Sequence, residues 1–110
     1  MNIDKFLNDW IAVSNAYDTE KYLEKYLENA ILDDISVGNI FVGHEGIRHY
    51  FTSYFIEYKT QTRLVKLNIN KMQAHIEVEF TGEFPEKQVG GTFDFKFKNG
   101  KIEKVTAALV

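Results

Sequence analysis

The sequence predicts a single α+β domain over residues 1–110, in which three helices pack on one face of a strongly curved, mostly antiparallel β-sheet. In the first half of the chain, apolar residues recur every three or four positions, which is typical of amphipathic helices. From Thr60 onward apolar and polar residues alternate, and short turns separate the alternating segments. With 110 residues, of which 45% are hydrophobic, the chain can fill one core but not two.

Two helices are expected at the start of the chain. The first covers residues 3–17, where one apolar stripe repeats at intervals of three and four. Asp18 is a residue type that caps helix N-termini, and Tyr22 and Tyr26 lie four positions apart after it. This spacing predicts a second, short helix that ends near Asn29.

A strand and a third helix follow. Residues 30–37 are rich in Ile, Leu and Val and too few for a helix, so they are predicted as a strand. Its carboxylates, Asp33 and Asp34, must point to opposite faces, but both faces are apolar, so periodicity leaves open which one faces inward. Gly38-Asn39 indicates a turn, and an aromatic-rich stripe predicts a helix over residues 44–57.

The second half of the chain predicts four antiparallel strands. The pattern alternates between residues 65 and 69, between 74 and 80, and again between 93 and 97. Asn99-Gly100 suits a two-residue hairpin turn, because a type I′ turn needs positive φ at both central residues, and a last strand follows it. The pair Gly90-Gly91 is expected to form a bulge that bends the sheet. A phosphate cradle is the alternative for this pair, but no helix N-terminus follows it.

Composition and charge exclude several classes of function. The net charge is −3 and no cluster of Lys and Arg interrupts it, so no nucleic-acid partner is expected. The chain has no cysteine, which excludes disulfides and thiolate chemistry and fits a reducing compartment. No basic, apolar leader and no apolar run near 20 residues is present, so we expect a cytoplasmic protein without a membrane partner.

Other polar groupings in the sequence do not predict a site. His44 and His49 are five residues apart rather than four, so they cannot share one metal ion on a helix, and no metal is expected. Arg48 is expected to be a solvated residue at a helix end. Alternating polar residues that include His75 and Glu77 predict the outer face of a sheet, where a second subunit could bind. No phosphate-binding loop is present, and no cofactor is expected.

Four stretches of the chain resemble the nuclear-transport-factor-2-like (NTF2-like) superfamily, in particular its SnoaL-like and ketosteroid-isomerase-like members. They are residues 17–18, 26–34 (YLENAILDD), 43–48 (GHEGIR) and 97–102 (FKNGKI), and their order and spacing extend the resemblance over nearly the whole chain. The resemblance implies a cone of helices against a bent sheet, with a mostly apolar pocket at its open end. It also implies a homodimer that forms through the sheet. Members include isomerases, cyclases and non-catalytic binding domains, so the fold alone does not choose a reaction.

The resemblance assigns roles to individual positions. Asp34 matches the general base of the ketosteroid-isomerase-like pattern, which moves a proton beside a carbonyl group. Trp10 occupies the position of the oxyanion-donating tyrosine and Phe51 that of the supporting tyrosine. Since Phe donates no hydrogen bond and Trp only one, steroid isomerisation is not expected.

The sequence therefore predicts a protein that binds a small apolar or aromatic ligand. Asp34 is the candidate catalytic residue, and the candidate ligand-binding residues are Trp10, Phe51, Tyr54 and Phe55. If the protein is an enzyme, isomerisation or cyclisation with one carboxylate as the base is expected. The alternative is a non-catalytic dimerisation or interaction module whose pocket is filled by its own core.

Overall fold

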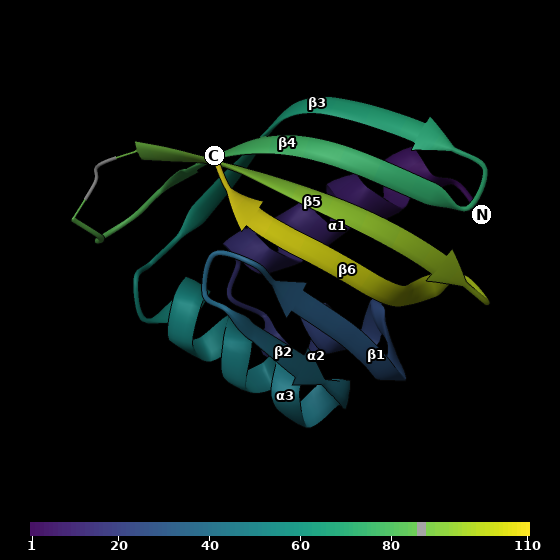
Figure 1. Ribbon diagram of the computed structural model, residues 1–110, viewed down its shortest axis with the longest axis horizontal. Coiled ribbons are helices and arrows are strands. Elements are labelled where there is room, and N and C mark those ends of the chain that lie inside the picture. Colours follow the sequence, from purple (N-terminus) through teal and green to yellow (C-terminus); the bar gives the residue numbers. More distant parts are fainter. Residues whose placement is uncertain (86–87) are drawn as a thin grey trace.

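The computed structural model describes residues 1–85 and 88–110 and has the predicted α+β architecture, with three helices and one curved, mostly antiparallel sheet (Figure 1). The helices are α1 (Ile3–Asn15), α2 (Thr19–Glu24) and α3 (Gly43–Phe51), which continues into a π-helical segment, η1 (Thr52–Ile56). The strands are β1 (Tyr26–Asp34), β2 (Asn39–Val42), β3 (Gln61–Asn70), β4 (Gln73–Thr81), β5 (Gln88–Lys98) and β6 (Lys101–Leu109).

The six strands form one sheet in the order β2-β1-β6-β5-β4-β3. Neighbouring strands are antiparallel except for β1 and β6, which run parallel and join the two halves of the chain. In Figure 1 the sheet bends strongly, α1 passes behind β3 to β6, and α3 lies beside β1 and β2. No helix of the described residues is long and apolar enough to span a membrane.

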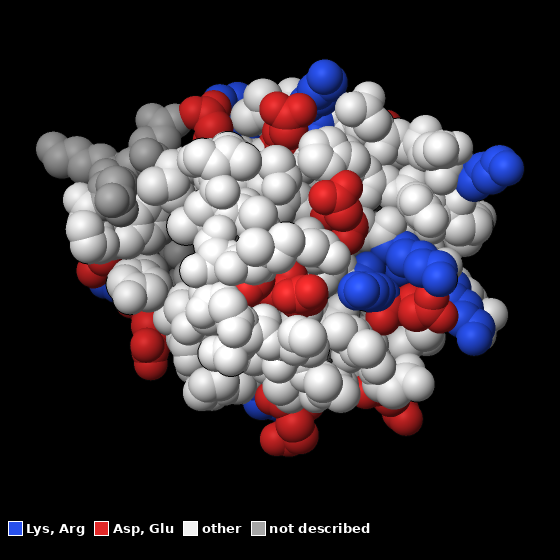
Figure 2. Space-filling view, viewed as in Figure 1, with Lys and Arg blue, Asp and Glu red and all other residues white. Residues whose placement is uncertain are grey.

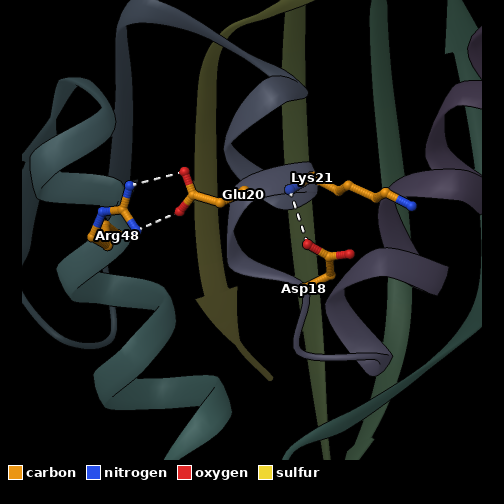
Figure 3. Close-up of polar contacts among 4 residues, drawn as sticks. All are labelled: Asp18, Glu20, Lys21 and Arg48. Atoms are coloured by element: carbon orange, nitrogen blue, oxygen red, sulfur yellow. Dashed lines mark hydrogen bonds and ion pairs between the residues drawn. The ribbon is translucent and has the colours of Figure 1, made fainter.

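Two side-chain caps start the first two helices. The Oδ1 atom of Asn2 accepts a hydrogen bond from the Lys5 backbone N–H at 3.0 Å, and that of Asp18 accepts one from the Lys21 N–H at 3.2 Å (Figure 3). The first helix ends two residues earlier than predicted, at Asn15. Tyr17 then adopts φ = 56°, a left-handed conformation that a helix cannot continue through.

The boundary between the second helix and the first strand differs from the prediction. The helix was expected to reach Asn29, but it ends at Glu24, and β1 begins at Tyr26 rather than at residue 30. The Lys25 carbonyl accepts a hydrogen bond from the Ile102 N–H at 2.9 Å, which draws this segment into the sheet. The predicted strand over residues 30–37 is therefore displaced toward the N-terminus. The chain turns after Asp34, and the short strand β2 was not predicted.

The other predicted elements are confirmed within a few residues. The helix predicted over residues 44–57 is α3 with η1, and the four later strands are β3 to β6. Asn99 and Gly100 have φ values of 52° and 75°, as the predicted hairpin turn requires.

Gly90 and Gly91 do not form the predicted bulge. Both residues pair with β4 in an unbroken register, Gly91 opposite Val78 and Gly90 opposite Glu79. A Cβ atom on Gly91 would lie 2.5 Å from the Phe80 ring. This glycine therefore leaves the space that the Phe80 ring occupies.

The core lies between the helices and the concave face of the sheet and is rich in aromatic rings. The Trp10 ring packs edge-on against Phe93 and Phe95, with centroids 5.1 and 5.2 Å apart. Its Nε1–H donates to the Tyr26 hydroxyl at 3.1 Å, which in turn donates to the Tyr22 hydroxyl at 2.8 Å. Burial raises the pKa of both tyrosines, so they stay protonated.

The outer face of the sheet is polar and charged, as predicted. His75 and Glu77 on β4 are partly exposed, and His75 Nδ1 lies 2.7 Å from Asp94 Oδ1 on β5. Figure 2 shows this face, with basic side chains gathered toward the end where β5 and β6 meet and acidic side chains more widely spread. The face therefore carries charges of both signs.

Candidate functional site

A pocket of about 230 Å³, partly open to solvent, lies where the end of β1 meets β6, η1 and the strands β4 and β5. Seven aromatic residues form about half of its wall: Tyr50, Tyr54, Phe55, Tyr58, Phe80, Phe84 and Phe93. Smaller residues complete it, together with one carboxylate: Asp34, Ser36, Val37, Thr60, Val89, Ala107, Ala108 and Leu109.

Asp34 is the last residue of β1, and its side chain is directed into this pocket. It pairs with Ala107 on β6 and is 8% exposed. Its Oδ2 atom accepts a hydrogen bond from the Tyr50 hydroxyl at 2.8 Å, and its Oδ1 atom accepts one from the Val37 backbone N–H at 3.0 Å. Asp33 lies outside the lining, so the structure answers the question that alternation left open.

Tyr50 was not predicted as a site residue, although it lies on the predicted aromatic stripe. Burial raises the pKa of its hydroxyl well above the usual value, and the charge of Asp34 and the hydrogen bond to it raise this pKa further. The hydroxyl therefore stays protonated and donates to the carboxylate. Its sequence signal is only an aromatic residue on a helix, because the packing of α3 against β1 decides which tyrosine meets Asp34.

The π-helical segment η1 supplies Tyr54 and Phe55, two of the predicted ligand-binding residues. Their rings lie 5.4 and 5.8 Å from the Tyr50 ring. A π-helix has hydrogen bonds between residues five apart, whereas an α-helix has them between residues four apart, so each π-helical turn holds more residues. The wider turn explains how two successive residues both reach the wall that Tyr50 begins.

Trp10 and Phe51, the other two predicted ligand-binding residues, lie outside the pocket wall. Both are in the core, 1% and 0% exposed, and Phe51 stacks on Tyr22 with ring centroids 4.0 Å apart. Successive helical residues point about 100° apart, so Phe51 turns away when Tyr50 faces Asp34. Asp34, Tyr54 and Phe55 thus line the pocket together, whereas Trp10 and Phe51 belong to the hydrophobic core.

The electrostatics of the pocket are simple. Among its described lining residues, Asp34 is the only one with a charged side chain. The hydroxyls of Tyr54 and Tyr58 also belong to lining residues and make no hydrogen bond within residues 1–85 and 88–110. The site therefore offers one hydrogen-bonded carboxylate, two available hydroxyl donors and an apolar wall.

The histidines and the arginine of α3 take no part in this wall. His44 Nε2 lies 2.9 Å from the Tyr26 carbonyl oxygen. Arg48 forms a bidentate ion pair with Glu20 of α2, with N–O distances of 2.6 and 3.4 Å (Figure 3). These contacts hold α3 against its neighbours, and the part of the chain that the structure describes contains no group of three potential metal ligands.

Comparison with known proteins identifies the fold. No protein-family model matches the sequence, and neither does any curated protein. Solved structures do match, and one is a candidate polyketide cyclase from Sinorhizobium meliloti, with a TM-score of 0.86, 17% identity and coverage of 97% of this chain and 98% of that one. Another is a candidate ketosteroid isomerase from Kribbella flavida, with a TM-score of 0.84, 13% identity and coverage of 96% and 76%.

A third similar structure is an NTF2-like protein of unknown function from Cytophaga hutchinsonii. Its TM-score is 0.82 at 10% identity, and the match covers 100% of this chain and 91% of that one. The chain therefore has the NTF2-like fold, as its resemblance to that superfamily implied. At these identities the likeness shows the fold and not the reaction.

Proposed function

We propose that this protein binds a small apolar or aromatic molecule in the pocket and that Asp34 acts there as the general base of an isomerase-type or cyclase-type reaction. The observation that carries the proposal is one buried carboxylate in a wall that is otherwise uncharged among the described residues. Pockets of this kind, with few polar groups that converge, are the usual place for small-molecule chemistry. The candidate polyketide cyclase and the candidate ketosteroid isomerase among the similar structures support this class of reaction.

The chemistry follows from the hydrogen bonds of the site. The carboxylate of Asp34 takes a proton from a carbon next to a carbonyl group, and the electrons of the broken C–H bond form an enolate. Tyr50 and Val37 hold the carboxylate in position. The hydroxyl of Tyr54 or Tyr58 donates to the enolate oxygen as its charge develops.

The reaction is completed when the enolate meets an electrophile. Return of the proton from Asp34 to another carbon gives isomerisation. Attack of the enolate carbon on a second carbonyl group closes a ring, and the proton then goes to the new alkoxide. Either course leaves Asp34 ionised again, as a catalytic base must be.

The cavity also bears on the alternative, an interaction module with a filled pocket. Such a module needs no space beside a buried carboxylate, whereas about 230 Å³ is present here. This volume lies below the roughly 300–1,000 Å³ of pockets for drug-sized ligands, so we expect a compact substrate.

Deuterium exchange at the α-carbons of small cyclic ketones, followed by ¹H NMR, tests the role of Asp34 as a base. We expect the wild-type protein to accelerate exchange and Asp34→Asn to abolish the acceleration while the protein stays folded. Asp33→Asn is the matched control, because it removes the neighbouring carboxylate that does not line the pocket. No acceleration by the wild type, or equal loss in both variants, would refute the role.

A further inference from the structure

The pocket carries a negative charge that no described residue of its wall balances. Neither Lys, Arg nor His is among these residues, and the donors to Asp34 are the neutral Tyr50 hydroxyl and the Val37 N–H. A buried carboxylate is stabilised when an opposite charge comes close to it. Charge complementarity therefore favours a positively charged group on the ligand.

The aromatic wall favours the same kind of ligand. The Tyr54 and Phe55 rings are tilted by 43° and 52° to the Tyr50 ring, so the wall presents rings in several orientations. The Tyr58 and Phe84 rings, 6.2 Å apart, add a second pair. Cations within about 6 Å of such ring faces are attracted by the ring quadrupole, and aromatic cages recognise alkylated ammonium groups in this way.

The composition of the pocket distinguishes among cations. A Ca²⁺ ion needs about six to eight oxygen ligands, and one carboxylate in an apolar wall does not supply them. A guanidinium group has five N–H donors in a rigid plane, and a mostly apolar wall with one carboxylate and a few hydroxyls does not match all five. An alkylated ammonium group has few or no N–H donors, and its carbon atoms suit contact with aromatic rings.

We infer that the pocket binds the alkylated ammonium group of a small organic cation, with Asp34 as its counter-ion and Tyr50, Tyr54 and Phe55 as aromatic contacts. The inference rests on the part of the proposed function in which the pocket binds a small molecule. It does not require Asp34 to take a proton. A cavity of about 230 Å³ suits a compact cation of this type.

Isothermal titration calorimetry with a matched pair of probes tests the inference. Choline carries a trimethylammonium group, and 3,3-dimethylbutan-1-ol has the same shape with carbon in place of the charged nitrogen. We expect choline to bind the wild-type protein at least tenfold more tightly. Equal or tighter binding of the neutral alcohol, or no binding of either probe, would overturn the inference.

Substitutions in the pocket test which side chains cause the preference for choline over the neutral alcohol. Asp34→Asn is expected to bring the two affinities within about threefold of each other, and Asp33→Asn, the control, to keep the wild-type ratio. Tyr54→Leu is a second test, at a partly exposed residue, and it should weaken the binding of choline more than the binding of the alcohol. A preference unchanged in both pocket variants would also overturn the inference.

The probe experiment and the ketone exchange fail independently. If only the neutral alcohol binds, the pocket is still a small-molecule site, and only the preference for an ammonium group is rejected. If the wild-type protein binds choline but does not accelerate ketone exchange, the role of Asp34 as a general base is rejected and the alkylated ammonium ligand stands.

Discussion

Replacement of Gly91 by alanine should destabilise the protein, although glycine is usually a poor residue for a strand. The new Cβ atom would lie 2.5 Å from Phe80 Cε2 and 3.2 Å from its Cζ. Ordinary carbon contacts are about 3.5–4.0 Å long, so the ring must retreat by roughly 1 Å. Phe55 and Phe93 hold this ring edge-on at 5.9 and 6.0 Å and resist the movement.

Two opposing energies decide the size of the effect at Gly91. Overpacking of a core costs about 1–3 kcal/mol. Removal of glycine lowers the entropy of the unfolded chain and returns about 0.4–1 kcal/mol. We therefore expect the free energy of unfolding to fall by about 1–2 kcal/mol, which lowers Tm by roughly 5–10 °C in a domain of this size.

Gly90→Ala is the matched control on the adjacent residue. Its Cβ atom would meet Val110 Cγ2 at 2.9 Å, but Val110 is 83% exposed and its side chain can rotate away. This variant should be as stable as the wild type or up to about 1 kcal/mol more stable. Urea unfolding followed by the fluorescence of Trp10, the single tryptophan, measures both changes. Equal stabilities of the two variants would refute the argument from ring packing.

Three further predictions concern other parts of the molecule. Burial raises the pKa of Tyr22, Tyr26 and Tyr50, so the unfolded chain loses these protons first above pH 10, and stability should fall by up to about 1.4 kcal/mol per pH unit for each. Urea midpoints between pH 8 and 11.5 measure this fall, and a flat profile would contradict it. Tyr50→Phe should cost about 1–3 kcal/mol in urea unfolding, because buried Asp34 loses a hydrogen-bond donor; unchanged stability would argue against that bond. For the homodimer expected through the outer sheet face, light scattering at micromolar concentration should give twice the mass of 12.8 kDa, and a monomer mass would reject it.

Local patterns predicted the second half of the fold because its strands pair with neighbours in sequence. Alternation from Thr60 onward and the positive φ values that Asn99-Gly100 allows are local properties, and β3 to β6 follow them. The first strand depends on a distant partner. Tyr22 and Tyr26 have helical spacing, but the backbone beside Tyr26 pairs with β6, and this pairing outweighs the local preference.

Sequence patterns predicted only part of the candidate site, because distant pairing also decides which side chains reach the pocket. Alternation shows that Asp33 and Asp34 face opposite sides, but only the pairing of β1 with β6 decides which of them faces the pocket. On the third helix, the aromatic stripe is wide, and the π-helical turn changes which residues share a face. Tyr54 and Phe55 therefore reach the pocket while Phe51 does not.

The parallel pairing of β1 with β6 has a consequence for how the protein folds. The Leu109 N–H donates to Ser36 Oγ at 2.8 Å across 73 residues, close to where Asp34 lies opposite Ala107. A contact between residues so far apart in sequence requires a large loop to close, and this closure costs chain entropy before the contact contributes any stability. The hairpins of β3 to β6 need no such closure and can form early. We expect the pocket to be among the last features to form during folding, because Asp34 and its partner Ala107 on β6 lie 73 residues apart in the sequence.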